Sequence, residues 1–256
     1  MNKLLELKNI SKTFNTLNGE IHAIEDISFD VYKGEFIGIV GSSGCGKSTL
    51  LNIIDELDKN YNGTIIKDNL KMSYMLQSDA LLPWLSVLDN ACLGLKLEKN
   101  LTKDNIEYVI ELIKKFGLES FMNQKPNNLS GGMKQRVALI RTLATKPDLI
   151  LLDEPLSALD YVTRLTITDE IYSILKEMNV TVILISHDIA ECVSFCNRIV
   201  VLSKRPAIIK NIYNINLEKN LIPSLNRKDK NFYIYYDLIW GDLDKWVLIK
   251  LNIWKK

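Results

Sequence analysis

The chain has 256 residues, and 47% of them are apolar, which is enough for one large domain or for a core with a smaller subdomain. Such a composition excludes a disordered chain. The 32 basic and 31 acidic residues leave a formal net charge of +1, which argues against a nucleic-acid-binding protein that relies on a broad basic face.

The first part of the sequence predicts strands. Residues 4–9 and 27–32 alternate or cluster apolar side chains, and Asn18-Gly19 predicts a turn between them. Phe36–Val40 is a short β-rich run that leads directly into a glycine-rich loop. An α/β protein that begins with strands is therefore expected.

Helices and strands then alternate. Residues 47–57 predict a helix, and residues 72–76 predict a further short strand. From residue 79 to about residue 141 the strand patterns disappear and helical periodicity takes over. Gly117 is expected to end one of these helices.

The second half returns to buried strands. Residues 149–152 are apolar throughout, and residues 180–185 and 199–202 predict two more buried strands, as in a parallel sheet covered on both faces; residues 158–178 are expected to be mostly helical. A strand-rich α/β core thus brackets a helical insertion. Beyond about residue 210 the pattern weakens, and no element is assigned there.

The cysteines give no sign of a metal or disulfide framework, because no two of the four are separated by two residues. Cys192 and Cys196 lie four apart on a predicted helix and are interpreted as buried thiols, which is typical of the cytosol. The N-terminus lacks the long apolar stretch of a signal peptide. Charged residues also interrupt the apolar tail at residues 232–254, so we expect a soluble chain whose membrane role needs a partner.

A glycine-rich loop follows the Phe36–Val40 run and fits the phosphate-binding pattern GxxxxGK[ST]. Its residues are Gly41, Ser42, Ser43, Gly44, Cys45, Gly46, Lys47 and Ser48. The glycines allow the backbone to approach phosphate, and its N–H groups converge on the anion at a helix N-terminus. Lys47 is expected to contact the β- and γ-phosphates, Ser48 to bind Mg²⁺, and Thr49 to reach the α-phosphate side. A chance glycine turn is the weaker alternative; the loop alone leaves kinases and GTPases open.

Two carboxylates, Asp153 and Glu154, end the apolar run at residues 149–152. The first is suited to holding Mg²⁺, commonly through water, and the second to acting as general base on the attacking water. A solvent-facing acidic pair at a strand end is the alternative interpretation. Magnesium-nucleotide chemistry is the simpler account, given the upstream loop.

The most informative stretch is 129–136, with the sequence Leu-Ser-Gly-Gly-Met-Lys-Gln-Arg. Together with the loop and the acidic pair it belongs to a set of six elements in a fixed order, completed by Gln77, residues 157–160 (Ser-Ala-Leu-Asp) and His187. In this order they make residues 3–210 resemble the ATP-binding subunits of ABC transporters.

The resemblance implies a P-loop NTPase fold with one ABC ATPase domain over residues 3–215. A RecA-like core would span about 3–77 and 142–210, and it would carry an N-terminal antiparallel β-subdomain. An inserted α-helical subdomain would span about 78–141. The tail, 216–256, has no assigned structure.

The resemblance also implies roles around the nucleotide. Phe14 would stack on adenine, Gln77 would contact Mg²⁺ or water, and His187 would bind the γ-phosphate and orient the water of Glu154.

Further roles belong to a subunit interface. Ser130, Gly131 and Gly132 would bind the γ-phosphate of ATP held on the opposite subunit, and Asp160 would lie across the interface. Two ATP molecules would thus be enclosed in a head-to-tail homodimer with two-fold symmetry.

Residues 80–85 (Ala-Leu-Leu-Pro-Trp-Leu) and the triplet 204–206 (Lys-Arg-Pro) look like those of the nitrate/sulfonate/taurine-type importer ATPases. In that family the region after Gln77 helps to form a groove for a permease helix, here with Leu81, Leu82, Pro83 and Trp84. The alternative is that Trp84 belongs to the subdomain core. The sequence departs from the family at Glu56, where glycine is usual, in a short 63–77 segment and in the tail.

We therefore expect an ATPase that uses ATP and Mg²⁺ to power solute import. Its partners would be an integral-membrane permease, a periplasmic or lipoprotein solute-binding protein and a second copy of itself, with no nucleic acid. It would lie peripherally on the cytoplasmic side of the membrane. The main alternative is a soluble ABC ATPase acting on nucleic acid or ribosomes; a third is an ATP-binding protein without turnover, which intact Lys47, Glu154 and His187 disfavour.

Overall fold

The structure is a computed structural model that describes residues 2–17, 19–157, 159–217 and 222–243. The chain forms two compact units, one made of Met1–Leu70 and Thr181–Lys256 and the other of residues 71–180. The α/β character and the antiparallel N-terminal sheet are confirmed. The subdomain boundaries expected from the sequence stay a prediction.

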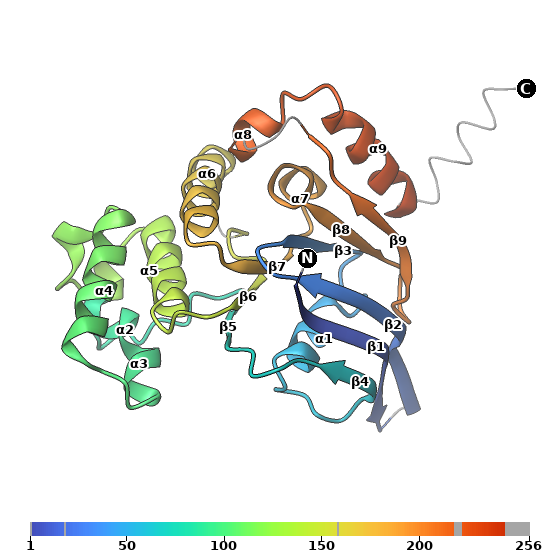
Figure 1. Cartoon of the computed structure of the whole chain (residues 1–256), viewed down its shortest axis with the longest axis horizontal. Helices are drawn as coiled ribbons and strands as arrows, with labels where there is room; N and C mark the ends of the chain where they lie inside the picture. The colour runs from blue at the N-terminus through green and yellow to red at the C-terminus, as the bar shows by residue number, and fades with distance from the viewer. Residues whose placement is uncertain (1, 18, 158, 218–221, 244–256) are drawn as a thin grey trace, which may run out of the picture. The chain divides into compact units, whose positions relative to one another are not determined.

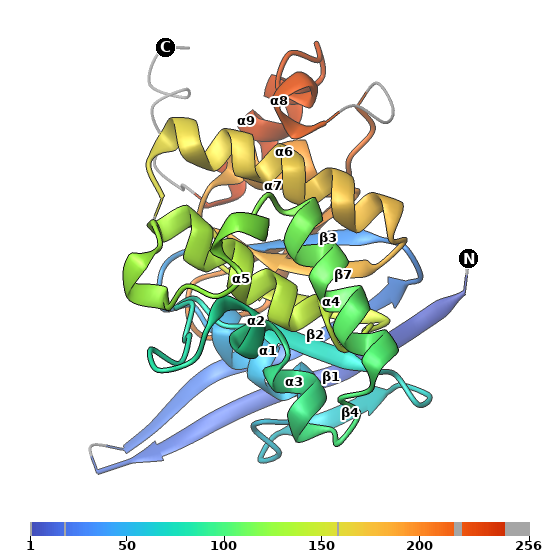
Figure 2. The same cartoon turned by 90° about the vertical axis from the view of Figure 1, so that its left-hand side faces the viewer.

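An antiparallel sheet begins the first unit, with β1 (Lys3–Thr16) between β2 (Gly19–Tyr32) and β4 (Asn62–Ile66). β1 and β2 form one long hairpin (Figure 2), which extends well beyond the two short strands that the sequence predicts. Asn18 of the predicted turn lies outside the described residues. Leu5 and Leu7 alternate inward along β1, so the pattern of the sequence sets the buried face.

Four further strands of the first unit are neighbours in the order β7 (Thr181–Ile185), β3 (Phe36–Val40), β8 (Arg198–Leu202) and β9 (Ile209–Asn214). β3 pairs in parallel with both β7 and β8, whereas β9 is antiparallel. Every residue of β3 and β7 is buried, as expected for strands covered on both faces. In Figure 1, α7 (Ile189–Phe195) lies on one side of these strands, and α1 and the hairpin lie on the other.

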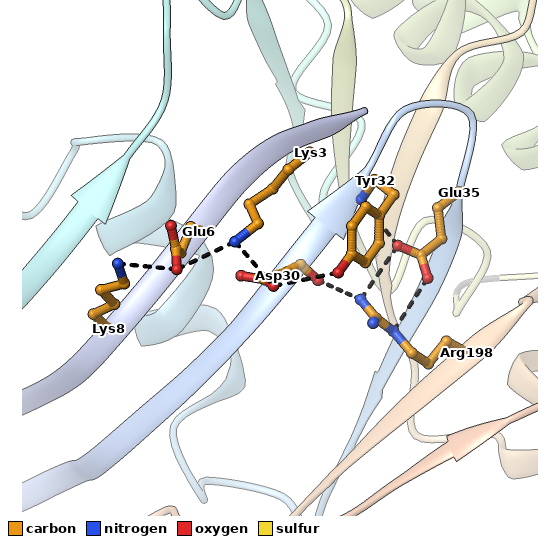
Figure 3. A network of polar contacts seen from close by, with 7 residues as sticks. All are labelled: Lys3, Glu6, Lys8, Asp30, Tyr32, Glu35 and Arg198. Carbon is orange, nitrogen blue, oxygen red and sulfur yellow. Dashed lines mark hydrogen bonds and ion pairs between the residues drawn. The ribbon is translucent and has the colours of Figure 1, made fainter. Parts of the chain in front are cut away.

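A polar network fastens the hairpin to the first residue of β8 (Figure 3). Arg198 pairs with Glu35 at 3.1 Å, donates to the backbone carbonyl of Asp30, and stacks its guanidinium over the ring of Tyr32. Burial raises the pKa of Glu35, against the opposing effect of the Tyr32 amide and Arg198. The outer members, Lys3, Glu6 and Lys8, are more exposed and add little stability.

The first helix, α1 (Lys47–Ile54), ends three residues before the predicted position 57. Glu56 follows with φ of 61°, in the left-handed region that favours glycine. A glycine, which the family usually has near this position, would adopt this left-handed conformation without strain. In this chain the Glu56 carboxylate pairs with Lys67 at 3.0 Å, which lowers its pKa.

The second unit holds two parallel strands and mostly helices, as the sequence predicts. β5 (Met72–Met75) pairs with β6 (Leu149–Asp153). The α-helices of its described residues are α2 (Val87–Ala91), α3 (Leu93–Leu97), α4 (Lys103–Lys115), α5 (Gly131–Leu143) and α6 (Tyr161–Glu177). Two short 3₁₀ turns, Glu119–Phe121 and Pro126–Asn128, precede α5. Gly117 has φ of 67° just beyond α4, which confirms it as a helix stop.

The sequence assigns no element beyond about residue 210, where the structure has most of β9 and, in the tail, α8 (Pro223–Asn226) and α9 (Phe232–Leu243). α9 packs against α7, β8 and β9. Asp242 anchors its end by accepting hydrogen bonds from Tyr213 and Asn211, both at 2.7 Å. Burial and the hydrogen bond to Asp242 raise the pKa of Tyr213 to about 12. No helix in the described part of the chain is long and apolar enough to cross a bilayer.

Gly38 of β3 should not tolerate a larger residue. A Cβ atom there would lie 3.1 Å from the Sγ of Cys196 and 3.3 Å from that of Cys192, and both thiols are buried. We expect Gly38→Ala to lower the free energy of unfolding by about 1–3 kcal/mol, because overpacking forces neighbours to shift. Urea denaturation measures this.

Cys196→Ala supplies the control for that experiment, because it removes the nearest sulfur. The double variant should lose less stability than the sum of the two single variants. Strict additivity would show that the Gly38–Cys196 contact is not the cause.

Candidate functional site

The phosphate loop, Gly41 to Ser48, joins β3 to α1 within the first unit. Lys47 is only 7% exposed, and its ammonium donates to the carbonyl oxygens of Gly41 at 2.9 Å and Ser42 at 3.2 Å. The loop therefore bends around the cation with its own backbone. Ser43 and Ser48 are exposed, while Cys45 is buried.

The backbone of this loop fits an anionic ligand. Gly44 and Gly46 have φ of 70° and 128°, which other residues rarely adopt. A Cβ atom on Gly46 would lie 3.1 Å from the carbonyl of Ala23, so the chain passes too closely for a side chain. Gly46 begins α1 without a side-chain cap, so the first N–H groups of the helix have no side-chain acceptor there. A phosphate group is the ligand that such a helix start favours.

Arg205 supports the loop from the β8–β9 connection, although the sequence pattern assigns it no role beyond marking a subclass. Its guanidinium donates to the carbonyl of Gly44 at 2.7 Å. Ser203 holds the connection together, because its hydroxyl donates to the Pro206 carbonyl at 2.9 Å and accepts from the Ile208 amide at 2.9 Å. The pattern GxxxxGK[ST] carries no signal for a contact this distant in sequence.

The acidic pair lies in the second unit, at the end of β6. Asp153 is 6% exposed and accepts a hydrogen bond from the Tyr74 hydroxyl at 3.3 Å. Glu154 has φ of 47°, a left-handed conformation, so its side chain does not continue the alternation of side chains along β6. Gln77 donates its amide N–H to the Glu154 carboxylate at 3.1 Å. The structure thus brings together two predicted site residues that are 77 positions apart.

The predicted signature residues form the start of α5. Ser130 is the N-cap, and its hydroxyl accepts from the Met133 amide at 3.4 Å; Gly131 and Gly132 are the first helical residues. A Cβ atom on Gly132 would lie 2.8 Å from the terminal methyl group of Ile167 of α6, so a larger residue there would require the Ile167 side chain to shift. Ser130 and Gly132 line an open pocket of about 290 Å³ between the starts of α5 and α6.

Asp160 caps the neighbouring helix. Its carboxylate accepts from the Thr163 amide at 3.0 Å, and hydrogen bonds from Thr163 lower its pKa. Tyr161 and Val162, which follow it, are largely exposed. Ala158 of the same predicted motif lies outside the described residues.

His187 follows β7 in the first unit and is exposed. A short ring of hydrogen bonds fixes the backbone on both sides of it. The Ser186 hydroxyl donates to Glu191 and accepts from the Asp188 amide at 3.0 Å, and Asp188 accepts from the Glu191 amide at 3.1 Å. Ser186 and Glu191 were not predicted from the sequence, although both are buried polar residues that such a turn requires.

The two predicted aromatic contacts are both accessible. Phe14 of β1 is 39% exposed, which leaves part of its ring open to a ligand. Trp84 is 66% exposed, so the interpretation that it belongs to the subdomain core is wrong. Leu81 and Leu82 beside it are half-buried, and Pro83 is exposed. The stretch after Gln77 therefore presents a partly apolar surface.

Comparison with known proteins identifies the family to which the chain belongs. The pattern of the ABC transporter family matches residues 24–157. The chain belongs to the ABC transporter family. Within it, the chain is an ATP-binding subunit, similar to the uncharacterized ABC transporter ATP-binding protein YtlC of Bacillus subtilis, with 38% identity over 94% of this chain and 95% of that protein.

Other members of the ABC transporter family are also similar. The aliphatic sulfonates import ATP-binding protein SsuB of Bacillus thuringiensis is 35% identical over 89% of this chain and 91% of its own length. The dimeric structure of the ABC transporter cassette MJ0796 superposes with a TM-score of 0.71 at 33% identity, over 83% of this chain and 99% of that one. The same cassette is known in a post-hydrolysis state with ADP and Pi. The resemblance inferred from the sequence, the fold class and the assignment as an ATPase are confirmed.

The contact between Arg205 and Gly44 should stabilise the bent conformation of the phosphate loop. We expect Arg205→Ala to weaken ATP binding several-fold, because a charge-assisted hydrogen bond that orders the loop is lost. Arg205→Lys should recover part of the affinity, since it keeps a cationic donor. Titration with a fluorescent ATP analogue measures both.

Lys204→Ala provides a matched control, because it removes the neighbouring exposed cation. An equal loss of affinity in the Lys204 and Arg205 variants would mean that net charge, and not the bond to Gly44, is responsible.

Proposed function

We propose that this ABC ATPase powers solute import by a membrane transporter, using ATP binding and hydrolysis to bring two copies together head to tail. The observation that carries the proposal is the complete set of nucleotide-directed residues, including Lys47, Glu154 and His187, in the order of the family. The relative SsuB, which is named as an import ATP-binding protein, supports the direction of transport.

On this proposal the phosphate loop binds the triphosphate of ATP. The ammonium of Lys47 exchanges the carbonyls of Gly41 and Ser42 for phosphate oxygens, which are stronger acceptors. The backbone amides from Gly44 to Thr49 surround the anion. Phe14 supplies an open ring face for the base.

The residues proposed to bind a divalent cation each offer an oxygen ligand of the kind that Mg²⁺ prefers: the Ser48 hydroxyl, the Asp153 carboxylate and the amide oxygen of Gln77. When bound, Mg²⁺ neutralises charge on the phosphates and withdraws electron density from the γ-phosphate. Gln77 uses its amide nitrogen on Glu154, so its oxygen is the atom that remains suited to a cation or to water.

Glu154 acts as general base toward the attacking water. Its left-handed backbone and its hydrogen bond from Gln77 fix the direction of the carboxylate. His187 donates to the γ-phosphate and orients the same water, and the Ser186–Glu191 ring fixes the peptide units beside it. Proton removal by a placed base is worth about 10²–10⁴ in rate.

The opposite copy completes each site in this proposal. Ser130, Gly131 and Gly132 offer a hydroxyl and the positive end of α5 to the γ-phosphate held by the twin subunit. Asp160 and the exposed start of α6 lie at the same interface. Because only the closed dimer engages both halves, ATP favours closure and hydrolysis reverses it. The dimeric MJ0796 cassette supports this assembly.

The partly apolar surface at Leu81, Leu82, Pro83 and Trp84 would receive a helix of an integral-membrane permease. A periplasmic or lipoprotein solute-binding protein would complete the system, and the ATPase would lie peripherally on the cytoplasmic face of the membrane. The alternative of a soluble ABC ATPase on nucleic acid is disfavoured, because the chain has one ABC unit and a net charge of only +1.

Glu154→Gln tests the proposal directly. We expect ATP to bind normally, hydrolysis to fall by about 10²-fold or more, and an ATP-bound dimer to accumulate, since the amide cannot accept the proton. Phosphate release and size-exclusion chromatography with ATP measure the two effects.

Glu170→Gln is the control, because that carboxylate pairs with Arg136 in the second unit and has no proposed role in hydrolysis. Normal turnover in Glu154→Gln would remove Glu154 from the role of base. A monomer that persists with ATP would contradict the head-to-tail assembly.

A further inference from the structure

Lys12 is a buried cation close to Phe14, the residue proposed to stack on the adenine base of ATP. It is 4% exposed in the middle of β1, although lysine rarely becomes so buried without a partner. Its ammonium contacts both carboxylate oxygens of Asp58, at 2.7 and 2.8 Å, and the carbonyl of Asn60 at 2.5 Å. These acceptors lie in the connection between α1 and β4, so two hydrogen bonds and an ion pair fix the position of the charge.

The same ammonium lies over the ring of Phe14, 4.7 Å from its centroid. Lys12 and Phe14 are two residues apart in one strand, and their side chains meet although the register with β2 shifts between Lys12 and Thr13. The cation covers one face of the ring. Phe14 is still 39% exposed, so part of the residue remains accessible to a ligand beside the cation.

We propose that Lys12 is a positioning residue for the nucleotide base, whose ammonium holds one face of the Phe14 ring and leaves the opposite face for the adenine of ATP. This inference rests on the proposed function, in which Phe14 stacks on the base. On this inference, Lys12 determines which face of the Phe14 ring stacks on adenine. It also contributes to the affinity for the base, although it does not contact the nucleotide.

Two physical effects follow from this geometry. A cation over a ring is attracted to its negative face, so the ring is held in one orientation and less freedom is lost when a base binds. The cation also draws π-electron density toward itself. The opposite face becomes less negative, which reduces its repulsion of the electron-rich face of a purine. Both effects act on the base and neither acts on the phosphates.

The ion pair with Asp58 is sufficient to explain why Lys12 is buried. It does not by itself predict an effect of Lys12 on ligand binding. A purely structural lysine would change the stability of the hairpin and would affect all ligands of the phosphate loop alike. A positioning lysine would affect ligands that carry a base and spare those that do not. ATP and inorganic triphosphate form such a pair, since both offer three linked phosphates.

The experiment measures the affinities of ATP and inorganic triphosphate, by calorimetry, for the full chain and its variants. Phe14→Leu should weaken ATP on the order of 10-fold and leave triphosphate unchanged, because only the stack is lost. Lys12→Met should weaken ATP by about 2- to 5-fold, again with triphosphate unchanged. In the Phe14→Leu background, Lys12→Met should have no further effect on ATP.

Lys8→Met is the matched control. Lys8 lies in the same strand with the same charge, but it pairs with Glu6 on the exposed surface. It should leave the ratio of the two affinities unchanged. If circular dichroism shows that Lys12→Met does not fold, Asp58→Asn replaces it; that variant loosens the anchor of Lys12 and should selectively weaken ATP.

The outcomes separate the inference from the proposed function. If Phe14→Leu weakens ATP but Lys12→Met does not, or if Lys12→Met weakens both ligands equally, the inference is overturned and the role of Phe14 stands. If Phe14→Leu leaves ATP binding unchanged, the assignment of Phe14 fails and the inference fails with it. A selective loss that disappears in the Phe14→Leu background supports the inference.

Discussion

The proposed nucleotide site depends on the loop between β3 and α1, which bends so that its backbone carbonyls hold the ammonium of Lys47. The lysine donates to carbonyls of the loop itself, at Gly41 and Ser42. An ammonium that is only 7% exposed needs such acceptors, and a phosphate offers better ones. The loop is therefore preorganised for an anion, and the buried strand β3 on one side and α1 on the other fix where it lies.

Residues far apart in sequence support this arrangement and the chemistry proposed to depend on it. Arg205 steadies Gly44 from the β8–β9 connection, and Gln77 holds the carboxylate of Glu154 within the second unit. In both contacts, a residue proposed to act at the nucleotide is oriented by a second residue that lies far from it in the sequence. Arg205 has no proposed contact with the nucleotide, so its replacement should change affinity without removing a ligand contact, whereas Gln77 is also proposed to contact Mg²⁺ or water.

The sequence predicts the elements whose pattern is local. The strand Phe36–Val40 has the bounds that the sequence predicts. The buried runs before Glu154 and His187 form β6 and β7. Short apolar runs bounded by polar residues are typical of buried strands. It could not predict the length of the β1–β2 hairpin, whose outer residues are polar and exposed. The contacts of Arg205, Lys12 and Glu191 were also missed, because they depend on which loops meet in space. The roles of the signature and interface residues, Ser130 and Asp160 among them, stay predictions.

The most direct test of the central claim is the affinity of the chain for ATP when the enclosed ammonium is removed. Lys47→Ala should abolish ATP binding or weaken it by on the order of 100-fold, while circular dichroism shows an intact fold, because the anion loses its charged partner. Lys134→Ala, which removes a lysine of α5, should bind ATP as the unchanged chain does. ATP affinity preserved in a folded Lys47→Ala chain would contradict the account.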